Sequence, residues 1–133
     1  METAAKLLVV GGVLNLAYGV VTGLLLTNVR MRRPEAPRYL VLAHLGPLMQ
    51  GPILLGLAVA VALSDLPASL ETLAASLLIA NSVAIAAGDT LNWTGGVRDA
   101  FAERSAGFYL NAAGAMLFAV GLLIILIGVL RGL

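Results

Sequence analysis

Four long apolar stretches divide the chain, and short segments between them contain most of its charged residues. We predict membrane-spanning helices at residues 5–26, 39–63, 70–91 and 108–130, because a helix needs about 20 apolar residues to cross a bilayer. The first stretch is longer than the apolar region of a cleaved signal peptide, about 7–15 residues, so we interpret it as a permanent span. The pattern predicts an all-α, integral membrane four-helix bundle forming one domain over residues 1–133.

Composition supports this assignment to the membrane class. Hydrophobic residues make up 60% of the chain and charged residues 11%, and the mean hydropathy is +1.00. Soluble domains contain about 25% charged residues. The absence of cysteine excludes disulfides, thiolate metal ligands and the attachment of c-type haem. The net charge of +1 says little about partners, and we expect membrane lipid and no nucleic acid.

Basic residues are distributed unevenly between the two ends of the predicted bundle. The first and third connecting segments contain Arg30, Arg32, Arg33, Arg38, Arg98 and Arg104, whereas the opposite end has Lys6 and Arg131. Cytoplasmic segments of membrane proteins are enriched in Lys and Arg. We therefore expect loops 1 and 3 in the cytoplasm, both termini outside, and a location in the cell (inner) membrane. Topology alone explains most of these arginines, and some are candidates to bind an anionic group.

Polar side chains recur within the predicted spans. They are Asn15, Tyr18, His44, Gln50, Asn81, Ser82, Asp89, Asn92, Tyr109 and Asn111. Such groups are costly in hydrocarbon and usually face a bundle interior or a cavity. At about 100° per residue, Asn81, Asp89 and Asn92 can face one side of the third span. We expect Asn15 and Asn111 to form interhelical hydrogen bonds, and the set containing His44 and Asp89 to form a pocket.

The segment AHLGPLMQGP, residues 43–52, places two prolines beside the only histidine of the chain. Pro47 and Pro52 lack the N–H group that a helix interior requires. Such interruptions persist in membrane spans where neighbouring groups or a cavity satisfy the freed backbone carbonyls. A distorted turn here could bring Gln50 closer to His44 than an ideal helix would.

His44 admits two interpretations. It can be a structural tie hydrogen-bonded to Asp89 or Asn92, or it can be a metal ligand, a common role for histidine. One histidine without cysteine cannot form a zinc site, but it can be the single proximal ligand of a haem. A haem with one protein ligand keeps its sixth coordination position open for a substrate. This arrangement suits a catalytic haem better than an electron-transfer haem.

The segment AHLGPLMQG resembles the second-helix motif of the styrene oxide isomerase and hydroxylaminobenzene mutase families, which are small four-helix membrane proteins. The isomerase pattern is similar to A-H-x-G-P-x-x-N-G and matches at Ala43, His44, Gly46, Pro47 and Gly51. The mutase pattern is similar to A-H-L-x-x-x-M-N-G and matches at His44, Leu45, Met49 and Gly51. The mutase resemblance extends to TG at residues 22–23 and RM at residues 30–31, and length and span number agree along the whole chain.

This resemblance implies haem b with His44 as its axial ligand, in a homotrimer. Ferric iron would act as a Lewis acid on the substrate oxygen, without net redox change. In the isomerases an epoxide C–O bond opens and a hydride shift yields a carbonyl compound. In the mutases a hydroxyl group moves from the nitrogen of an arylhydroxylamine to the ring, which yields an aminophenol. The Gly-Pro pair after the histidine favours epoxide isomerisation.

The resemblance also implies roles for other residues. Gln50 stands where the family has a pocket-lining asparagine, and spacing from His44 places Asn81 and Asp89 where the isomerases have an aspartate and a tyrosine. We expect Gln50 and Asn81 to line the pocket, and Asp89 to position substrate or help a proton move. The candidates to bind haem propionates are Arg30, Arg32, Arg33 and Arg38, since arginine forms strong hydrogen bonds with carboxylates. Gln50, Asn81 and Asp89 differ from the residues of the family at the matching positions, and these differences predict a pocket adapted to another substrate.

A small transporter or a non-catalytic membrane subunit is the alternative from another class. Small multidrug exporters resemble a design with a glutamate in the first span, where this chain has only Asn15 and Tyr18. A structural subunit with His44 tied to Asp89 stays open. Only the haem hypothesis predicts a coloured protein.

Overall fold

The computed structural model describes residues 2–133, and over that range its regular structure is entirely helical. The helices are α1 (Thr3–Arg32), α2 (Arg38–Ala62), α3 (Ala68–Thr94), α4 (Ala100–Glu103) and α5 (Ala106–Gly132). All except α4 are long and apolar enough to cross a membrane. The prediction of an all-α bundle with four potential spans is confirmed, and these helices fit a multi-pass membrane protein.

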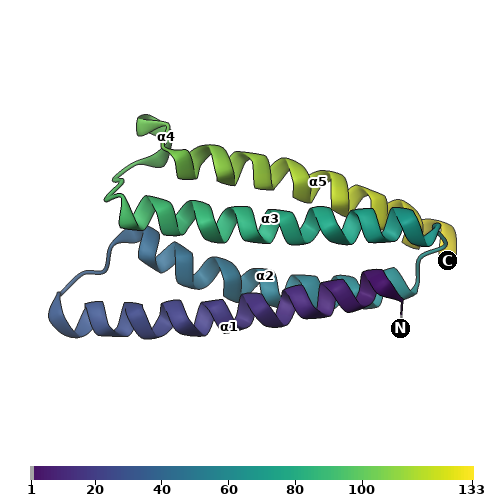
Figure 1. Cartoon of the computed structure of the whole chain (residues 1–133), viewed down its shortest axis with the longest axis horizontal. Coiled ribbons are helices and arrows are strands. Elements are labelled where there is room, and N and C mark those ends of the chain that lie inside the picture. The colour runs from purple at the N-terminus through teal and green to yellow at the C-terminus, as the bar shows by residue number, and fades with distance from the viewer. Residues whose placement is uncertain (1) are drawn as a thin grey trace.

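The four long helices form two antiparallel pairs. Figure 1 shows α1 beside α2 and α3 beside α5, with both termini at one end of the molecule and α4 at the other. The ends of α1 and α3 and the starts of α2 and α5 meet near α4. All six arginines of the first and third connections therefore lie at the α4 end, which we call the arginine-rich end.

The helices extend beyond the predicted spans, most clearly in α1, which ends at Arg32 instead of residue 26. Arg30 and Arg32 lie in its last turn, where cations interact favourably with the helix dipole. The helix stops because Arg33 is extended, with φ −138° and ψ 143°, and precedes Pro34, which disfavours the helical conformation of the residue before it. Hydropathy reports the apolar part of a helix and misses such polar ends.

The short helix α4 was not predicted from the sequence. Oδ1 of Asp99 accepts hydrogen bonds from the backbone N–H groups of Phe101 and Ala102, at 3.0 and 3.2 Å. Arg104 then ends the helix in a left-handed conformation, with φ 45°. Ser105 caps α5 by accepting from the N–H group of Phe108 at 3.1 Å. Aspartate and serine are preferred N-caps, so the sequence held a local signal for both starts.

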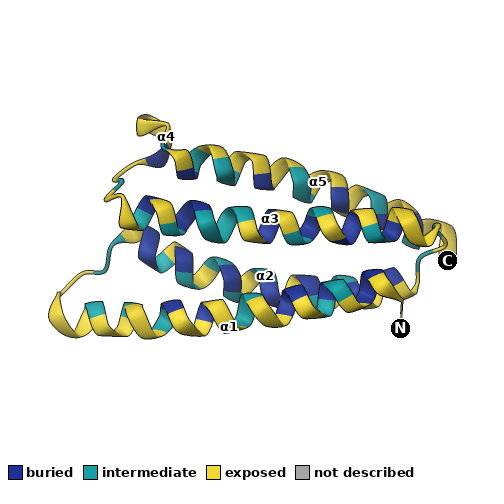
Figure 2. Cartoon of the chain, viewed as in Figure 1, coloured by how far each residue is buried: buried dark blue, intermediate teal, exposed yellow. Residues whose placement is uncertain are grey.

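Glycines at every seventh position line the face of α5 that packs on its neighbours. Gly107, Gly114, Gly121 and Gly128 are the buried glycines of this helix. A Cβ on Gly121 would lie 2.9 Å from Cγ of Leu78 and 3.1 Å from the carbonyl oxygen of Ala74, so α3 and α5 approach closely here. Small residues allow such approach in membrane helices. The remaining surface of α5 is largely exposed and apolar (Figure 2).

Glycines also bring α1 and α2 together. Gly12 and Gly51 face each other, and a Cβ on either would lie 3.0 Å from the carbonyl oxygen of the other. Gly19 and Gly23, the GxxxG of α1, face Leu48 and His44 of α2. This motif therefore packs helices within one chain. Despite Pro47 and Pro52, α2 continues as one helix through both prolines.

The two halves of the bundle differ in the chemistry of their interiors. Near the termini an apolar cluster joins all four long helices, with Leu8, Leu54, Leu78 and Ile125 at its centre. Nearer the arginine-rich end the buried side chains include Asp89 and Asn92. The half near the termini therefore supplies most of the apolar packing, with Glu71 as a buried acidic residue at the start of α3, and the other half contains Asp89 and Asn92.

The glycine seam of α5 predicts a strong effect of added volume. We expect Gly121→Leu to destabilise the bundle by about 1–3 kcal/mol, because overpacking forces side chains and backbone to shift. Ala115→Leu is the matched control, since Ala115 is exposed on the same helix. Unfolding of both variants in mixed detergent micelles measures the difference. Equal stability of the two would contradict the close packing of α3 on α5.

The loop before α4 predicts a pH-dependent local stability. Oε1 of Glu103 accepts from the backbone N–H groups of Arg98 and Asp99, at 2.9 and 3.1 Å. These bonds favour the charged form and lower the pKa of Glu103 below its ordinary 4.5. The stabilisation is therefore present above pH 4.5 and lost as the pH falls through the lowered pKa. Hydrogen exchange of the two amides should accelerate in that acidic range beyond the intrinsic pH dependence of exchange, and Glu103→Gln should remove that excess.

Candidate functional site

His44 packs against α1, not against α3. Its Nδ1 lies 2.8 Å from the backbone carbonyl oxygen of Gly19. A carbonyl oxygen can only accept, so Nδ1 donates the hydrogen bond, and in the uncharged ring Nε2 then keeps the lone pair. The contact depends on Gly23, because a Cβ there would lie 2.7 Å from Cε1 of His44. The two glycines of the GxxxG therefore form the seat of the histidine.

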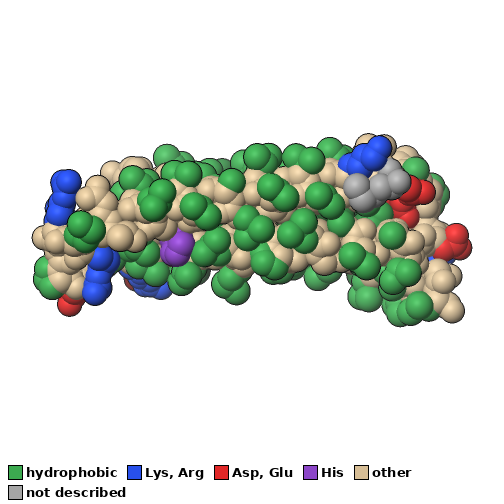
Figure 3. All heavy atoms as spheres, turned by 90° about the horizontal axis from the view of Figure 1, so that it is seen from below, with side chains coloured by type: hydrophobic (Ala, Val, Ile, Leu, Met, Phe, Trp, Pro, Cys, Tyr) green, Lys and Arg blue, Asp and Glu red, His purple; other side chains and the backbone are tan. Residues whose placement is uncertain are grey.

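The imidazole of His44 lies at the outer surface of the bundle. It is partly buried. Figure 3 shows the chain's only histidine on a face of the molecule where most side chains are apolar. A ring whose Nδ1 is held by a backbone carbonyl is oriented as metal-ligating histidines usually are. The arrangement leaves Nε2 as the nitrogen able to bind a metal.

Gln50 and Asn81 lie together between α2 and α3. Nδ2 of Asn81 donates to Oε1 of Gln50 at 3.3 Å, a direct contact between these residues that the sequence analysis did not predict. Asn81 is fully buried, and its Oδ1 has no hydrogen-bond partner among the described residues. A Cβ on Gly114 would lie 3.2 Å from that oxygen, which places the unpaired acceptor against α5.

Asp89 lies on the far side of α2 from His44. Its Oδ1 accepts from Nδ2 of Asn111 on α5 at 2.9 Å. Its Oδ2 lies 3.8 Å from where a Cβ on Gly46 would be. His44 and Gly46 are two residues apart on one helix, which turns them about 200° from each other. The structure therefore does not bring His44 and Asp89 together, and the suggested tie between them is replaced by the bond to Gly19.

The three polar residues of α3 share one face, as the sequence indicated, and that face packs on the α5 side. Asn92 accepts from the hydroxyl of Ser105 at 2.6 Å, Asp89 binds Asn111, and Asn81 lies beside Gly114. The expectation that Asn111 forms an interhelical hydrogen bond is confirmed. These contacts tie α3 to α5 and its N-terminal cap.

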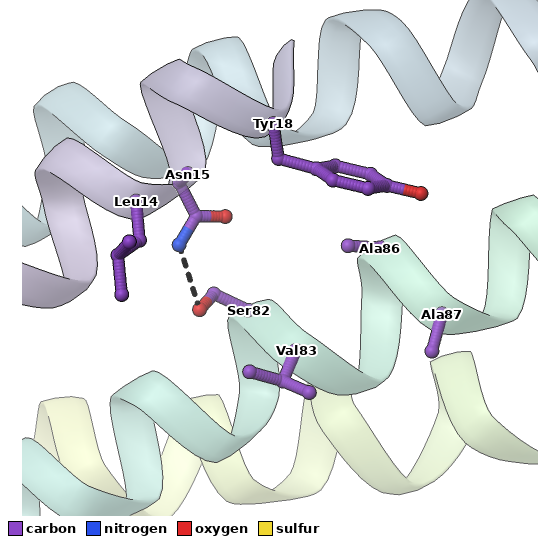
Figure 4. A pocket seen from close by; sticks show the side chains of 7 residues that line it. All are labelled: Leu14, Asn15, Tyr18, Ser82, Val83, Ala86 and Ala87. Carbon is purple, nitrogen blue, oxygen red and sulfur yellow. Dashed lines mark hydrogen bonds between the residues drawn. The ribbon is translucent and has the colours of Figure 1, made fainter. Parts of the chain in front are cut away.

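A separate groove opens between α1 and α3, in a place that the sequence analysis did not single out. It has a volume of about 370 Å³ and is lined by Leu14, Asn15, Tyr18, Ser82, Val83, Ala86 and Ala87 (Figure 4). Nδ2 of Asn15 donates to Ser82 at 3.0 Å, which confirms the predicted interhelical role of Asn15. The hydroxyls of Tyr18 and Thr90 lie 2.6 Å apart.

The donor set limits which metal groups could bind. Residues 2–133 contain no cluster of three or more His, Cys, Asp or Glu side chains that could hold a metal ion. A haem needs only one axial histidine from the protein, and the half-buried His44, with Nδ1 held by the carbonyl of Gly19, fits that role. The residues present therefore fit a haem better than a metal ion held by protein ligands alone.

The four arginines considered for haem propionates divide into two groups. Arg30, Arg32 and Arg33 are exposed at the end of α1, the helix whose Gly19 binds His44 of α2. Arg38 lines a hollow with Trp93 and Arg98, at the end of α3. The sequence did not predict this hollow, because its two arginines are sixty positions apart and come to line one hollow only when the helices pack.

The contact between Asp89 and Asn111 predicts coupled effects on stability. Asp89→Leu and Asn111→Leu should together destabilise the bundle by less than the sum of the single effects. The difference should be about 0.6–1.7 kcal/mol, between the average and the largest coupling found for interhelical hydrogen bonds in a membrane protein. Asn15→Leu combined with Asp89→Leu should instead be additive, since Asn15 binds Ser82. Unfolding of the single and double variants in detergent tests both statements.

Comparisons with protein-family models, with curated proteins and with solved structures found no match for this chain. The functional argument therefore rests on the residues and on the geometry described above.

Proposed function

We propose that the protein is a haem b-dependent integral membrane isomerase acting on a small lipophilic oxygenated substrate. The observation that supports this proposal best is the seat of His44: Nδ1 is held by the carbonyl of Gly19, which leaves Nε2 as the nitrogen with a free lone pair on a half-buried ring at the bundle surface. The resemblance of residues 43–51 to the isomerase and mutase motif supports the same assignment. When bound, ferric haem would supply a Lewis acid that polarises the substrate oxygen.

The protein's own contribution begins with the orientation of the imidazole. The carbonyl of Gly19 fixes the tautomer and the rotation of the ring, and such outer hydrogen bonds raise the basicity of a ligating nitrogen. The absence of a side chain on Gly23 leaves space for the ring beside α1. The neighbours of His44 in α2 include the exposed apolar residues Leu42 and Leu45, so the ring lies on a largely apolar face of the bundle. These features would favour chemistry on a lipophilic substrate delivered from the membrane.

In the proposal the polar groups of α2 and α3 act on the substrate from the interior of the bundle, and Asp89 does so from the far side of α2 relative to His44. Gln50 and Asn81 form one hydrogen-bonded pair of uncharged amides, which can donate to or accept from an oxygen or nitrogen of a substrate. Asp89 is the carboxyl group nearest to this pair along α3, and Asn111 orients it. In the proposal it positions substrate or helps a proton move. Epoxide to carbonyl rearrangement is the favoured reaction, and arylhydroxylamine to aminophenol conversion is the second.

The proposal also covers the oligomeric state, the orientation in the membrane and the arginines that would bind the haem propionates. We propose a homotrimer in the cell (inner) membrane with the arginine-rich end in the cytoplasm, because basic segments favour that side. Arg30, Arg32 and Arg33 are candidates to bind haem propionates, since they lie at the end of the helix that seats His44. The exposed apolar surface of α5 suits contact with lipid or with a second copy of the chain.

A non-catalytic subunit is the competing function, and one observation favours it. The bond from His44 to Gly19 ties α2 to α1 and would stabilise the helix pair without any cofactor. The two functions differ in a simple property, because only the haem protein absorbs visible light.

The decisive experiment is the ultraviolet–visible spectrum of detergent-purified protein from haem-replete cells. We expect a Soret band in the wild type that is lost or shifted in His44→Ala. Gly23→Ala should weaken it as well, because the new Cβ would lie 2.7 Å from Cε1 of His44. Gly56→Ala is the matched control, since a Cβ there meets no atom within 4 Å, and its spectrum should equal that of the wild type.

Two outcomes would contradict the proposal. A colourless wild-type protein would exclude haem and leave His44 as a structural tie. A Soret band that persists unchanged in a folded His44→Ala variant would assign the haem to another ligand. With haem established, product analysis after incubation with styrene oxide or phenylhydroxylamine separates the two reactions, and absence of product from both would leave a haem protein with another substrate.

A further inference from the structure

We propose that the hollow between the start of α2 and the end of α3 binds the phosphate headgroup of an anionic phospholipid. It has a volume of about 330 Å³, and its lining includes Arg38, Tyr39, Trp93, Gly96 and Arg98. This site is distinct from the seat of His44, which faces α1. The inference does not depend on the proposed isomerase function.

The only charged residues among those that line the hollow are two arginines. They are Arg38 and Arg98, and no Asp or Glu is part of the lining. Two acidic residues of the adjoining loop lie next to Arg98 outside the lining, and their carboxylates accept from backbone amides: Asp99 caps α4, and Glu103 accepts from the N–H groups of Arg98 and Asp99. Guanidinium groups bind phosphate oxygens through strong, often paired hydrogen bonds. The hollow therefore complements a phosphate monoanion.

The two sides of the hollow are held together by Tyr39. Its ring is buried, and its hydroxyl accepts from the backbone N–H group of Ala100 at 2.8 Å. This bond ties the start of α2 to the segment that follows α3. The guanidinium of Arg38 lies 5.7 Å from the centre of the Tyr39 ring, within the range of a cation–π interaction. The arginines are thus brought together by the fold, although they are far apart in sequence.

The position of the hollow favours a lipid over a soluble anion. It lies where α2 begins and α3 ends, at the boundary between the apolar spans and the arginine-rich loops. Trp93 lines it, and tryptophan concentrates at membrane–water interfaces, at the level of the headgroups. Basic pockets between helices on the cytoplasmic side are typical sites for anionic lipids. A phospholipid could place its phosphate between the guanidinium groups and its chains along the helices.

The experiment compares lipid binding by the full-length protein and matched variants in neutral detergent. Native mass spectrometry and thermal unfolding are recorded with added phosphatidylglycerol or phosphatidylcholine. We expect phosphatidylglycerol to bind and raise the unfolding temperature, and phosphatidylcholine to have little effect. Arg98→Gln should weaken phosphatidylglycerol binding about fivefold, the effect of one basic residue near an anionic surface. Arg104→Gln is the matched control, since Arg104 is exposed at the same end and does not line the hollow.

Four results would overturn the proposal. Equal binding of the two lipids would remove the requirement for negative charge, and equal loss in Arg104→Gln and Arg98→Gln would indicate diffuse attraction to the whole end. If millimolar inorganic phosphate occupied the hollow and abolished lipid binding, the hollow would be a site for the free anion. Loss of a Soret band in Arg98→Gln would assign the hollow to a haem propionate. Failure of the haem proposal alone leaves the lipid result unaffected.

Discussion

Close approach of helix backbones at glycine is the interaction on which the rest of this structure depends. Within a membrane the hydrophobic effect does not drive helices together, so packing and hydrogen bonds must do so. The seam of α5 and the paired glycines Gly12 and Gly51 bring the backbones together. The same principle creates the seat of His44, because the ring can reach the carbonyl of Gly19 only where side chains are missing from α1.

The polar groups follow from this packing. Once α3 and α5 lie close, Asp89 and Asn111 fall within hydrogen-bond distance, and each satisfies a group that would be costly in hydrocarbon. The α1–α2 pair and the α3–α5 pair are joined by Gln50 with Asn81 and by Asn15 with Ser82. Structural and proposed functional roles therefore overlap, since amides that could contact a substrate also hold the helix pairs in register.

Sequence reasoning succeeded where the pattern within one helix decides the outcome, and it did not identify which residue of a neighbouring helix each polar side chain contacts. The spans were found because about 20 apolar residues suffice to cross a bilayer, and Asn81, Asp89 and Asn92 share the face that their spacing indicated. The placement of His44 beside Asp89 was not supported, because spacing along a helix does not say which neighbour a side chain faces. Helix α4 was missed because its capping residues lie in a short polar loop.

The sequence by itself determined the class of the protein, the four apolar helices, the uneven distribution of arginine and the presence of a single histidine in an unusual segment. These are properties of composition and of local periodicity, which need no knowledge of neighbours. Only the tertiary structure decided that His44 binds the backbone of α1, that Asp89 binds α5, and that Arg38 and Arg98 line one hollow. Each of these depends on the rotation of one helix against another, which close packing at glycine sets.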